Sequence, residues 1–288
     1  MKFKPTALII LITLVWAACS SGGKKEQAEN GEEKKIIEEG TSTDEAISGE
    51  ELSYSAEGDS VELHGYLAYD KSIEDKRPGI LVVHEWWGHN EYARERADLL
   101  AELGYVALAV DMYGEGKQAS HPDDAGKFAG MVMQNAEGAK ERFAAAMEKL
   151  KSNPNVDPEK IGAIGYCFGG SVALSMANAG MDLDAVAVFH AGLKLPIQPE
   201  QGEVKAKILV CNGADDNFIA PEDIENFKNS MEEANVDYEF VSYEGAVHSF
   251  TSPDADSLGT QFELPLAYNK EADEDSWNKM QELFALVF

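Results

Sequence analysis

The chain has 288 residues, and 44% of them are hydrophobic, which is enough for one large α/β core or two small domains. The formal net charge of −28 argues against nucleic-acid binding, because such binding needs a surface that neutralises phosphates. Three cysteines, Cys19, Cys167 and Cys211, do not make a disulfide framework in a chain of this length.

Residues 1–19 have the pattern of a bacterial lipoprotein signal peptide. Two lysines precede an apolar stretch of about 12 residues, which is shorter than the roughly 20 that a membrane-spanning helix needs. Small residues precede Cys19 and a Ser/Gly run follows it. We expect lipidation of Cys19, export, and attachment to a bacterial membrane on the periplasmic side or at the cell surface. Because Trp16 occupies a position that is usually aliphatic, an uncleaved or ordinary secreted form is the alternative.

Residues 20–52 are rich in Gly, Ser, Glu and Lys and contain no aromatic side chain. Such a composition buries too little apolar surface to offset the entropy of the chain. We therefore predict a disordered acidic linker over 20–52 and a folded domain over 53–288.

From residue 53 onward, apolar runs alternate with segments of helical character. The first run alternates apolar and polar residues like an antiparallel strand, whereas later runs are continuously apolar, as in strands buried on both faces. This order predicts an α/β fold with a mostly parallel sheet and helices on both faces. The expected strands are 61–69, 79–84, 105–110, 161–165, 185–189, 207–210 and 238–243, and the expected helices are 91–103, 121–151, 169–179, 221–234 and 273–288.

The decapeptide 161–170, IGAIGYCFGG, contains the G-x-nucleophile-x-G spacing of a nucleophile elbow. In such a strand–turn–helix unit, Gly165 and Gly169 let the two elements pack closely, and the turn exposes the side chain of Cys167. The backbone N–H of Phe168, at the helix start, faces any oxyanion formed beside the sulfur. The alternative is a small buried core cysteine.

Two further polar residues follow strand ends in the same half of the chain. Asp216 comes after the strand near Cys211 and is better placed than Asp215, and His248 follows the last strand. The order nucleophile, acid, histidine is that of α/β-hydrolases. His248 takes the thiol proton or pairs with the thiolate, and Asp216 orients and stabilises the imidazolium.

Other polar motifs predict no cofactor. His84 and His89 flank Glu85 on a loop without a further ligand cluster, so we expect no metal site. No glycine-rich phosphate loop or dinucleotide fingerprint follows a strand.

Five segments together carry a resemblance to a known family: 84–88 (HEWWG), 111–114 (DMYG), 165–170 (GYCFGG), 213–219 and 248–250 (HSF). From about Tyr54 to Phe288, the chain resembles the dienelactone hydrolase family of α/β-hydrolases. The resemblance implies Cys167, Asp216 and His248 as the catalytic triad. It also implies that Glu85 contacts the resting thiol, accepts its proton when substrate arrives and so gates thiolate formation.

The resemblance further implies an oxyanion hole formed by the backbone N–H groups of Trp86 and Phe168. Trp86 and its neighbour Trp87 are also candidates for the walls of an apolar pocket.

The chain departs from the dienelactone-cleaving members at two arginines that hold the substrate carboxylate. Glu115 and Ser252 lie near the expected arginine positions. Lys117 is a candidate substitute, whereas Arg94 and Arg96 lie on a predicted helix and are expected to be solvated. A neutral ester or lactone does not need the missing charges.

These observations predict an α/β-hydrolase that cleaves a small-molecule carboxylic ester or lactone through a thioester on Cys167. It needs no cofactor, binds no nucleic acid and contacts the membrane only through its anchor. The alternatives are another acyl or thioester hydrolase with the same triad, and a lipoprotein that kept the fold for binding without turnover.

Overall fold

The structure is a computed structural model that describes residues 46–288. The predicted signal peptide, Cys19 and most of the predicted linker lie outside the described residues. None of the helices within 46–288 combines the length and the apolar character needed to cross a membrane.

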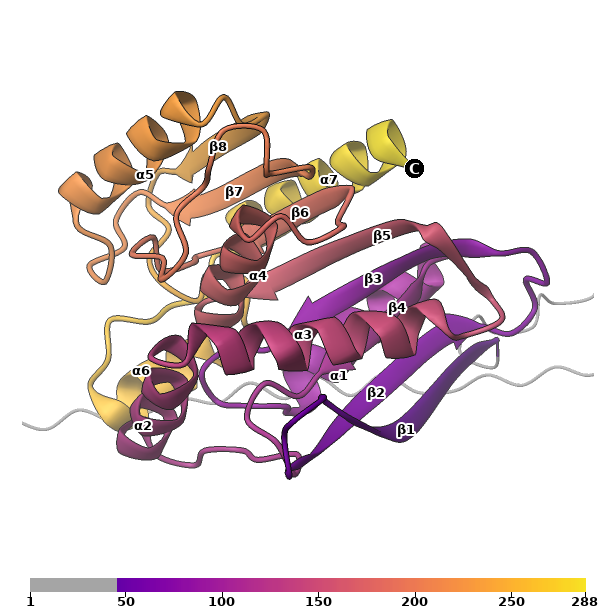
Figure 1. Ribbon diagram of the computed structural model, residues 1–288. Helices are drawn as coiled ribbons and strands as arrows, with labels where there is room; N and C mark the ends of the chain where they lie inside the picture. The colour runs from indigo at the N-terminus through magenta and orange to yellow at the C-terminus, as the bar shows by residue number, and fades with distance from the viewer. Residues whose placement is uncertain (1–45) are drawn as a thin grey trace, which may run out of the picture. The chain divides into compact units, whose positions relative to one another are not determined.

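One sheet of eight strands organises this part of the chain, in the order β1-β2-β4-β3-β5-β6-β7-β8 (Figure 1). β2 pairs antiparallel with both β1 and β4, and the remaining neighbours pair in parallel. The mostly parallel sheet predicted from the sequence is therefore confirmed. The strands are β1 (Ile47–Ser55), β2 (Glu62–Asp70), β3 (Arg77–Val83), β4 (Val106–Val110), β5 (Val156–Tyr166), β6 (Ala185–Phe189), β7 (Lys207–Gly213) and β8 (Tyr238–Tyr243).

The first strand begins before the predicted domain boundary at residue 53, so that boundary was placed too late. β1 pairs with β2 along its whole length, from Ile47 opposite Asp70 to Ser55 opposite Glu62. It is an edge strand, and most of its side chains are exposed or half-buried. Such a strand can be polar, so its composition resembles that of the predicted linker, and the sequence pattern did not separate the two.

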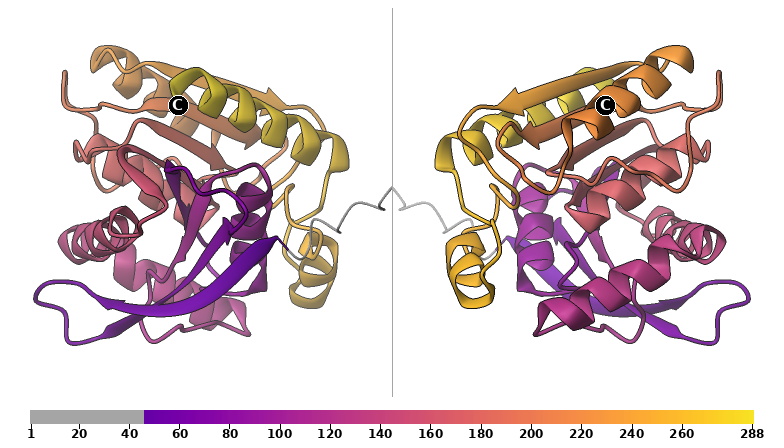
Figure 2. Two further views of the ribbon diagram at one scale, coloured as in Figure 1. Left: turned by 90° about the vertical axis from the view of Figure 1, so that its right-hand side faces the viewer. Right: turned by 90° about the vertical axis from the view of Figure 1, so that its left-hand side faces the viewer.

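Helices cover both faces of the sheet (Figure 2). α1 and α7 pack on one face, and α3 and α4 pack on the other. Successive residues of β3 point to opposite faces, so Ile80 lies in the core with α1 and α7, whereas Leu81 lies in the core with α3 and α4. The helices are α1 (Glu91–Glu102), α2 (Pro122–Met133), α3 (Ala136–Lys151), α4 (Phe168–Asn178), α5 (Pro221–Glu233), α6 (Ala255–Phe262) and α7 (Lys270–Val287).

The predicted helical region 121–151 is two helices, because the chain turns at Gln134 and Asn135. The side chain of Asn135 accepts a hydrogen bond from the backbone N–H of Gly138 and so caps the start of α3. The short helix α6 was not predicted. It has only 8 residues, one of which is Gly259, and so presents a weak periodic pattern.

The tight turn between β5 and α4 is the predicted elbow. Cys167 has φ of 51° and ψ of −117°, an unusual conformation for a residue with a side chain. A Cβ on Gly165 would lie 2.3 Å from the carbonyl oxygen of Gly169, and one on Gly169 would lie 2.3 Å from the carbonyl oxygen of Val83. Only glycine therefore fits at these positions, where the start of α4 packs against the ends of β5 and β3.

Candidate active site

The three residues predicted as a triad meet at the carboxyl edge of the parallel strands. Cys167 lies in the elbow after β5, Asp216 lies three residues beyond β7, and His248 lies in the loop after β8. His248 Nε2 is 3.0 Å from Cys167 Sγ, and His248 Nδ1 is 2.7 Å from Asp216 Oδ2. The sulfur, imidazole and carboxylate thus form one hydrogen-bonded chain, although they come from three separate parts of the sequence.

The surroundings of His248 favour its protonated form. Burial alone would lower the pKa of the imidazole, but the adjacent Cys167 sulfur and the Asp216 carboxylate raise it to about 10. The second carboxylate oxygen of Asp216 accepts a hydrogen bond from the backbone N–H of Phe218, which fixes the orientation of the carboxylate. The arrangement therefore suits an imidazolium beside a thiolate.

Two residues that line the same cavity as Cys167 have a backbone N–H group without an acceptor within residues 46–288. They are Trp86 and Phe168, the two residues expected to form an oxyanion hole. Phe168 is the first residue of α4, where backbone N–H groups have no partner within the helix. Such donors can bind a negative oxygen without rearrangement of the chain.

Glu85 is buried, and its interaction differs from the expected contact with the resting thiol. Its Oε1 accepts a hydrogen bond of 3.0 Å from the hydroxyl of Ser249, whereas the sulfur of Cys167 is engaged by His248. Burial raises the pKa of the Glu85 carboxyl, and the Ser249 hydroxyl opposes this rise. Ser249 adjoins His248, so Glu85 reaches the triad through the histidine loop. The sequence offered no signal for this contact.

Replacing Glu85 by glutamine is expected to stabilise the fold at pH 7.5 but not at pH 4. At a pH below 4.5, the ordinary pKa of a glutamate carboxyl, Glu85 is mostly protonated in both the folded and the unfolded chain. Its burial then carries little ionisation cost. As pH rises, the unfolded chain ionises first, and the native protein loses stability relative to the variant. Chemical unfolding of both proteins at the two pH values measures this difference.

The matched control for that comparison is Glu225→Gln, at an exposed position in α5. Its effect on unfolding free energy should be similar at the two pH values. A Glu85→Gln protein that was less stable than wild type at pH 7.5 would contradict the assignment of a buried, costly carboxyl.

An apolar cavity of about 270 Å³ opens onto the sulfur. Among residues 46–288, no lysine, arginine or acidic side chain lines it. The ring of Phe218 packs edge-on against His248 with centroids 4.9 Å apart. Trp86 lines this cavity as expected, whereas Trp87 lines a separate one beside Glu85. The catalytic pocket is lined by Trp86, Ala129, Met133, Cys167, Phe168, Ser171, Gly192, Phe218, Ile219, His248 and Leu266.

The candidate substitutes for the missing arginines are engaged elsewhere. Lys117 pairs with Glu115 at 2.8 Å, and Arg94 pairs with Glu51. The expectation that Arg96 is solvated was wrong, because its side chain is buried and forms a 3.0 Å ion pair with Asp273. None of these cations lines the catalytic pocket.

Arg96 instead supports the loop that carries His248. Its guanidinium donates a hydrogen bond to the carbonyl oxygen of Thr251 and lies over the ring of Tyr92. The Thr251 hydroxyl is 2.7 Å from the Tyr92 hydroxyl and 2.8 Å from His190 Nε2. The His190 ring in turn packs edge-on against His248. His190 is therefore a buried residue that supports the loop carrying His248.

Cys211 is buried in β7, and both cysteines within residues 46–288, Cys167 and Cys211, are free thiols. Within residues 46–288, no three His, Cys, Asp or Glu side chains are arranged to hold a metal ion.

Comparisons with known proteins agree on the kind of protein this chain resembles. The profile of the dienelactone hydrolase family matches residues 63–288. Protein usf of Aquifex pyrophilus is 29% identical over 226 residues, which cover 77% of this chain and 92% of that protein.

Two solved structures are similar over 84% of this chain and 99% of their own length. One is named m3DLH, with 36% identity and a TM-score of 0.79. The other is a dienelactone hydrolase-like promiscuous phosphotriesterase, P91, from metagenomic libraries, with 33% identity and a TM-score of 0.77.

Proposed function

The chain belongs to the dienelactone hydrolase family and is a hydrolase of this kind, and we propose that it cleaves neutral carboxylic esters or lactones through a covalent thioester on Cys167. The observation that carries this proposal is the hydrogen-bonded chain from Cys167 through His248 to Asp216, at the mouth of an apolar pocket.

In the acylation step, the thiolate of Cys167 attacks the ester carbonyl carbon and forms a C–S bond. The N–H groups of Trp86 and Phe168 stabilise the negative oxygen. When the C–O bond breaks, the His248 imidazolium gives its proton to the departing alkoxide, and an alcohol leaves. The product is a thioester and a neutral His248 held by Asp216.

In the deacylation step, water attacks the thioester carbonyl carbon. His248 takes one proton from this water, and the other proton stays on the carboxylic acid that is released. Breaking the C–S bond returns the thiolate beside the imidazolium. The sum of the two steps is ester plus water giving acid plus alcohol.

The lining of the catalytic pocket supports a neutral substrate. Because no lysine or arginine lines it, a carboxylate on the acyl chain would be buried without a cationic partner. We expect 4-nitrophenyl butyrate to be hydrolysed with a kcat/KM about 100-fold above that of 4-nitrophenyl hemisuccinate, since burial of an unpaired charge costs at least roughly 3 kcal/mol. Similar values for the two esters would show that the pocket accepts the charge, and the neutral-substrate assignment would fail.

We also propose, from the sequence pattern alone, that the protein is exported and anchored by a lipid on Cys19. Cells fed a clickable fatty-acid analogue are expected to label the wild-type chain and not a Cys19→Ser chain, since serine cannot form the thioether to the lipid. Label on the serine variant would contradict this anchor.

A further inference from the structure

A second cavity, of about 390 Å³, lies between α2 and α3 and is separate from the catalytic pocket. We call it the α2–α3 pocket. None of its lining residues also lines the catalytic pocket. Its apolar lining consists of Val61, Tyr113, Phe128, Met131, Val132 and Ala139.

Tyr113 contacts two residues that line the catalytic pocket. Its hydroxyl donates a 2.9 Å hydrogen bond to the carbonyl oxygen of Trp86, and its ring packs against that of Phe168 with centroids 5.3 Å apart. The side chain of Tyr113 therefore lines the α2–α3 pocket and also packs against residues of the catalytic pocket.

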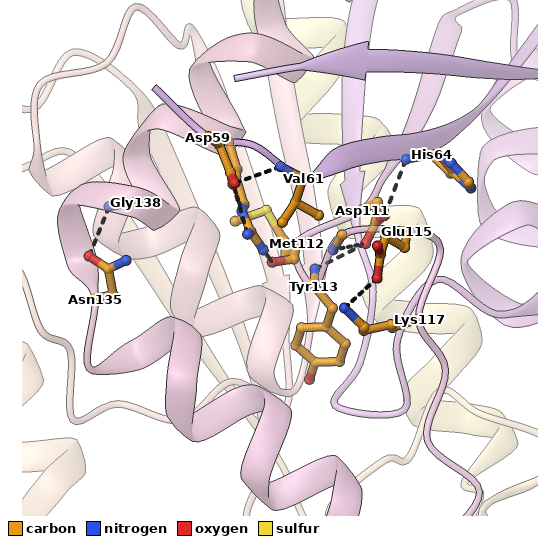
Figure 3. Close-up of polar contacts among 12 residues, drawn as sticks. Asp59, Val61, His64, Asp111, Met112, Tyr113, Glu115, Lys117, Asn135 and Gly138 are labelled. Carbon is orange, nitrogen blue, oxygen red and sulfur yellow. Dashed lines mark hydrogen bonds and ion pairs between the residues drawn. The ribbon is translucent and has the colours of Figure 1, made fainter. Parts of the chain in front are cut away.

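Cationic side chains surround this apolar space (Figure 3 shows part of the lining). The guanidinium of Arg142 already has partners within the protein, because it donates hydrogen bonds to the Asp59 carboxylate and to the carbonyl oxygen of Met112. Lys117 forms an exposed pair with Glu115. Lys127 differs, since it is an exposed residue of the lining with no ion-pair partner among residues 46–288.

Two acidic residues, Asp123 and Asp124, lie one turn before Lys127 on α2, but neither is within ion-pair distance of it. Asn135 also lines the pocket, and its Oδ1 is used by the N–H of Gly138. Asn135 is exposed, and its amide NH₂ group has no acceptor within the described residues. The α2–α3 pocket thus has an apolar interior, with the Lys127 cation and the Asn135 amide donor at its edge.

We propose that the α2–α3 pocket binds a small monocarboxylate with an aliphatic chain. The volume lies in the range of ligand pockets. The aliphatic chain contacts Phe128, Met131 and Val132, and the carboxylate accepts hydrogen bonds from Lys127 and Asn135.

Octanoate is the probe that tests this site, with octan-1-ol as a neutral ligand of the same chain length. Titration calorimetry on full-length Cys167→Ala protein removes any need for turnover, so a failure of the proposed hydrolysis would leave the result unchanged. We expect saturable 1:1 binding of octanoate and at least about tenfold weaker binding of octan-1-ol, because the alcohol lacks the charge-assisted contact.

Variants added to the same background then locate the site. Lys127→Gln is expected to weaken octanoate binding about tenfold through loss of the charged hydrogen bond. Lys149→Gln makes the same change in net charge at an exposed position of α3 outside the pocket, and should bind like the parent protein. Met131→Glu, at a side chain that is 64% exposed, should abolish binding without disturbing the core.

Three outcomes would overturn the proposal. One is the absence of saturable octanoate binding, and another is equal affinity for octanoate and octan-1-ol. The third is unchanged affinity in both Lys127→Gln and Met131→Glu, which would place the carboxylate in another part of the protein.

Discussion

Replacing Cys167 by alanine is expected to lower kcat/KM for 4-nitrophenyl butyrate by about 10⁴-fold or more, because the variant has no atom to form the acyl intermediate. His248 and Asp216 would remain, but a histidine that must activate water directly is a far poorer catalyst than one whose Nε2 lies 3.0 Å from a cysteine nucleophile. The folded structure should persist, since Cys167 is only partly buried and makes no disulfide.

Cys211→Ala is the matched control for this loss. Cys211 is the other cysteine within the described residues, and its sulfur lies in β7, 3.9 Å from the Tyr243 hydroxyl. We expect a stability cost of about 1–2 kcal/mol from the small cavity and hydrolysis close to that of wild type. If Cys167→Ala protein kept activity within tenfold of wild type, a cysteine nucleophile would be excluded. Hydrolysis would then proceed by a different mechanism.

Replacing Asp216 by asparagine is expected to lower kcat about 10³-fold near neutral pH, because an amide neither neutralises the imidazolium nor fixes its tautomer. The carboxylate helps to hold the pKa of His248 at about 10. Without it, that pKa falls, so the imidazolium–thiolate pair is lost at a lower pH. The alkaline limb of the pH–rate profile should therefore move to lower pH in the variant, and a merely structural role for Asp216 would not produce that shift.

The neighbouring residue supplies a close control. Asp215 is exposed, and its carboxylate accepts a hydrogen bond from the N–H of Gly245. Asp215→Asn should change kcat by no more than about twofold, as is usual for surface substitutions. If Asp215→Asn were the damaging change and Asp216→Asn were mild, the acid of the triad would have been assigned to the wrong residue.

The parallel strands, and the meeting of Cys167, Asp216 and His248 at one edge of the sheet, were predictable because both follow from local patterns and strand order. Continuous apolar runs mark strands covered on two faces, as in β3 and β6. Residues that follow the ends of parallel strands gather at one edge of the sheet, so the topology alone brings Cys167, Asp216 and His248 together. The glycines of the elbow could be assigned from sequence because the turn leaves no space for a Cβ.

What was missed depends on contacts between distant residues. The burial of Arg96 requires the ion pair with Asp273 and the rings of Tyr166 and Trp277, which come from other parts of the chain. A charged residue on an amphipathic helix gives no sign of such partners. In the same way, the contact from Ser249 to Glu85 joins residues 164 positions apart.

The acyl-enzyme itself is the most direct test of covalent catalysis. Wild-type protein mixed with 4-nitrophenyl butyrate and quenched in acid within the first turnovers should gain the mass of one butyryl group, and peptide mapping should place it on Cys167. Hydroxylamine should remove the group, as expected for a thioester. Sustained hydrolysis with no adduct on Cys167, or with the adduct on another residue, would contradict a cysteine nucleophile, and the absence of both adduct and hydrolysis would favour a binding protein.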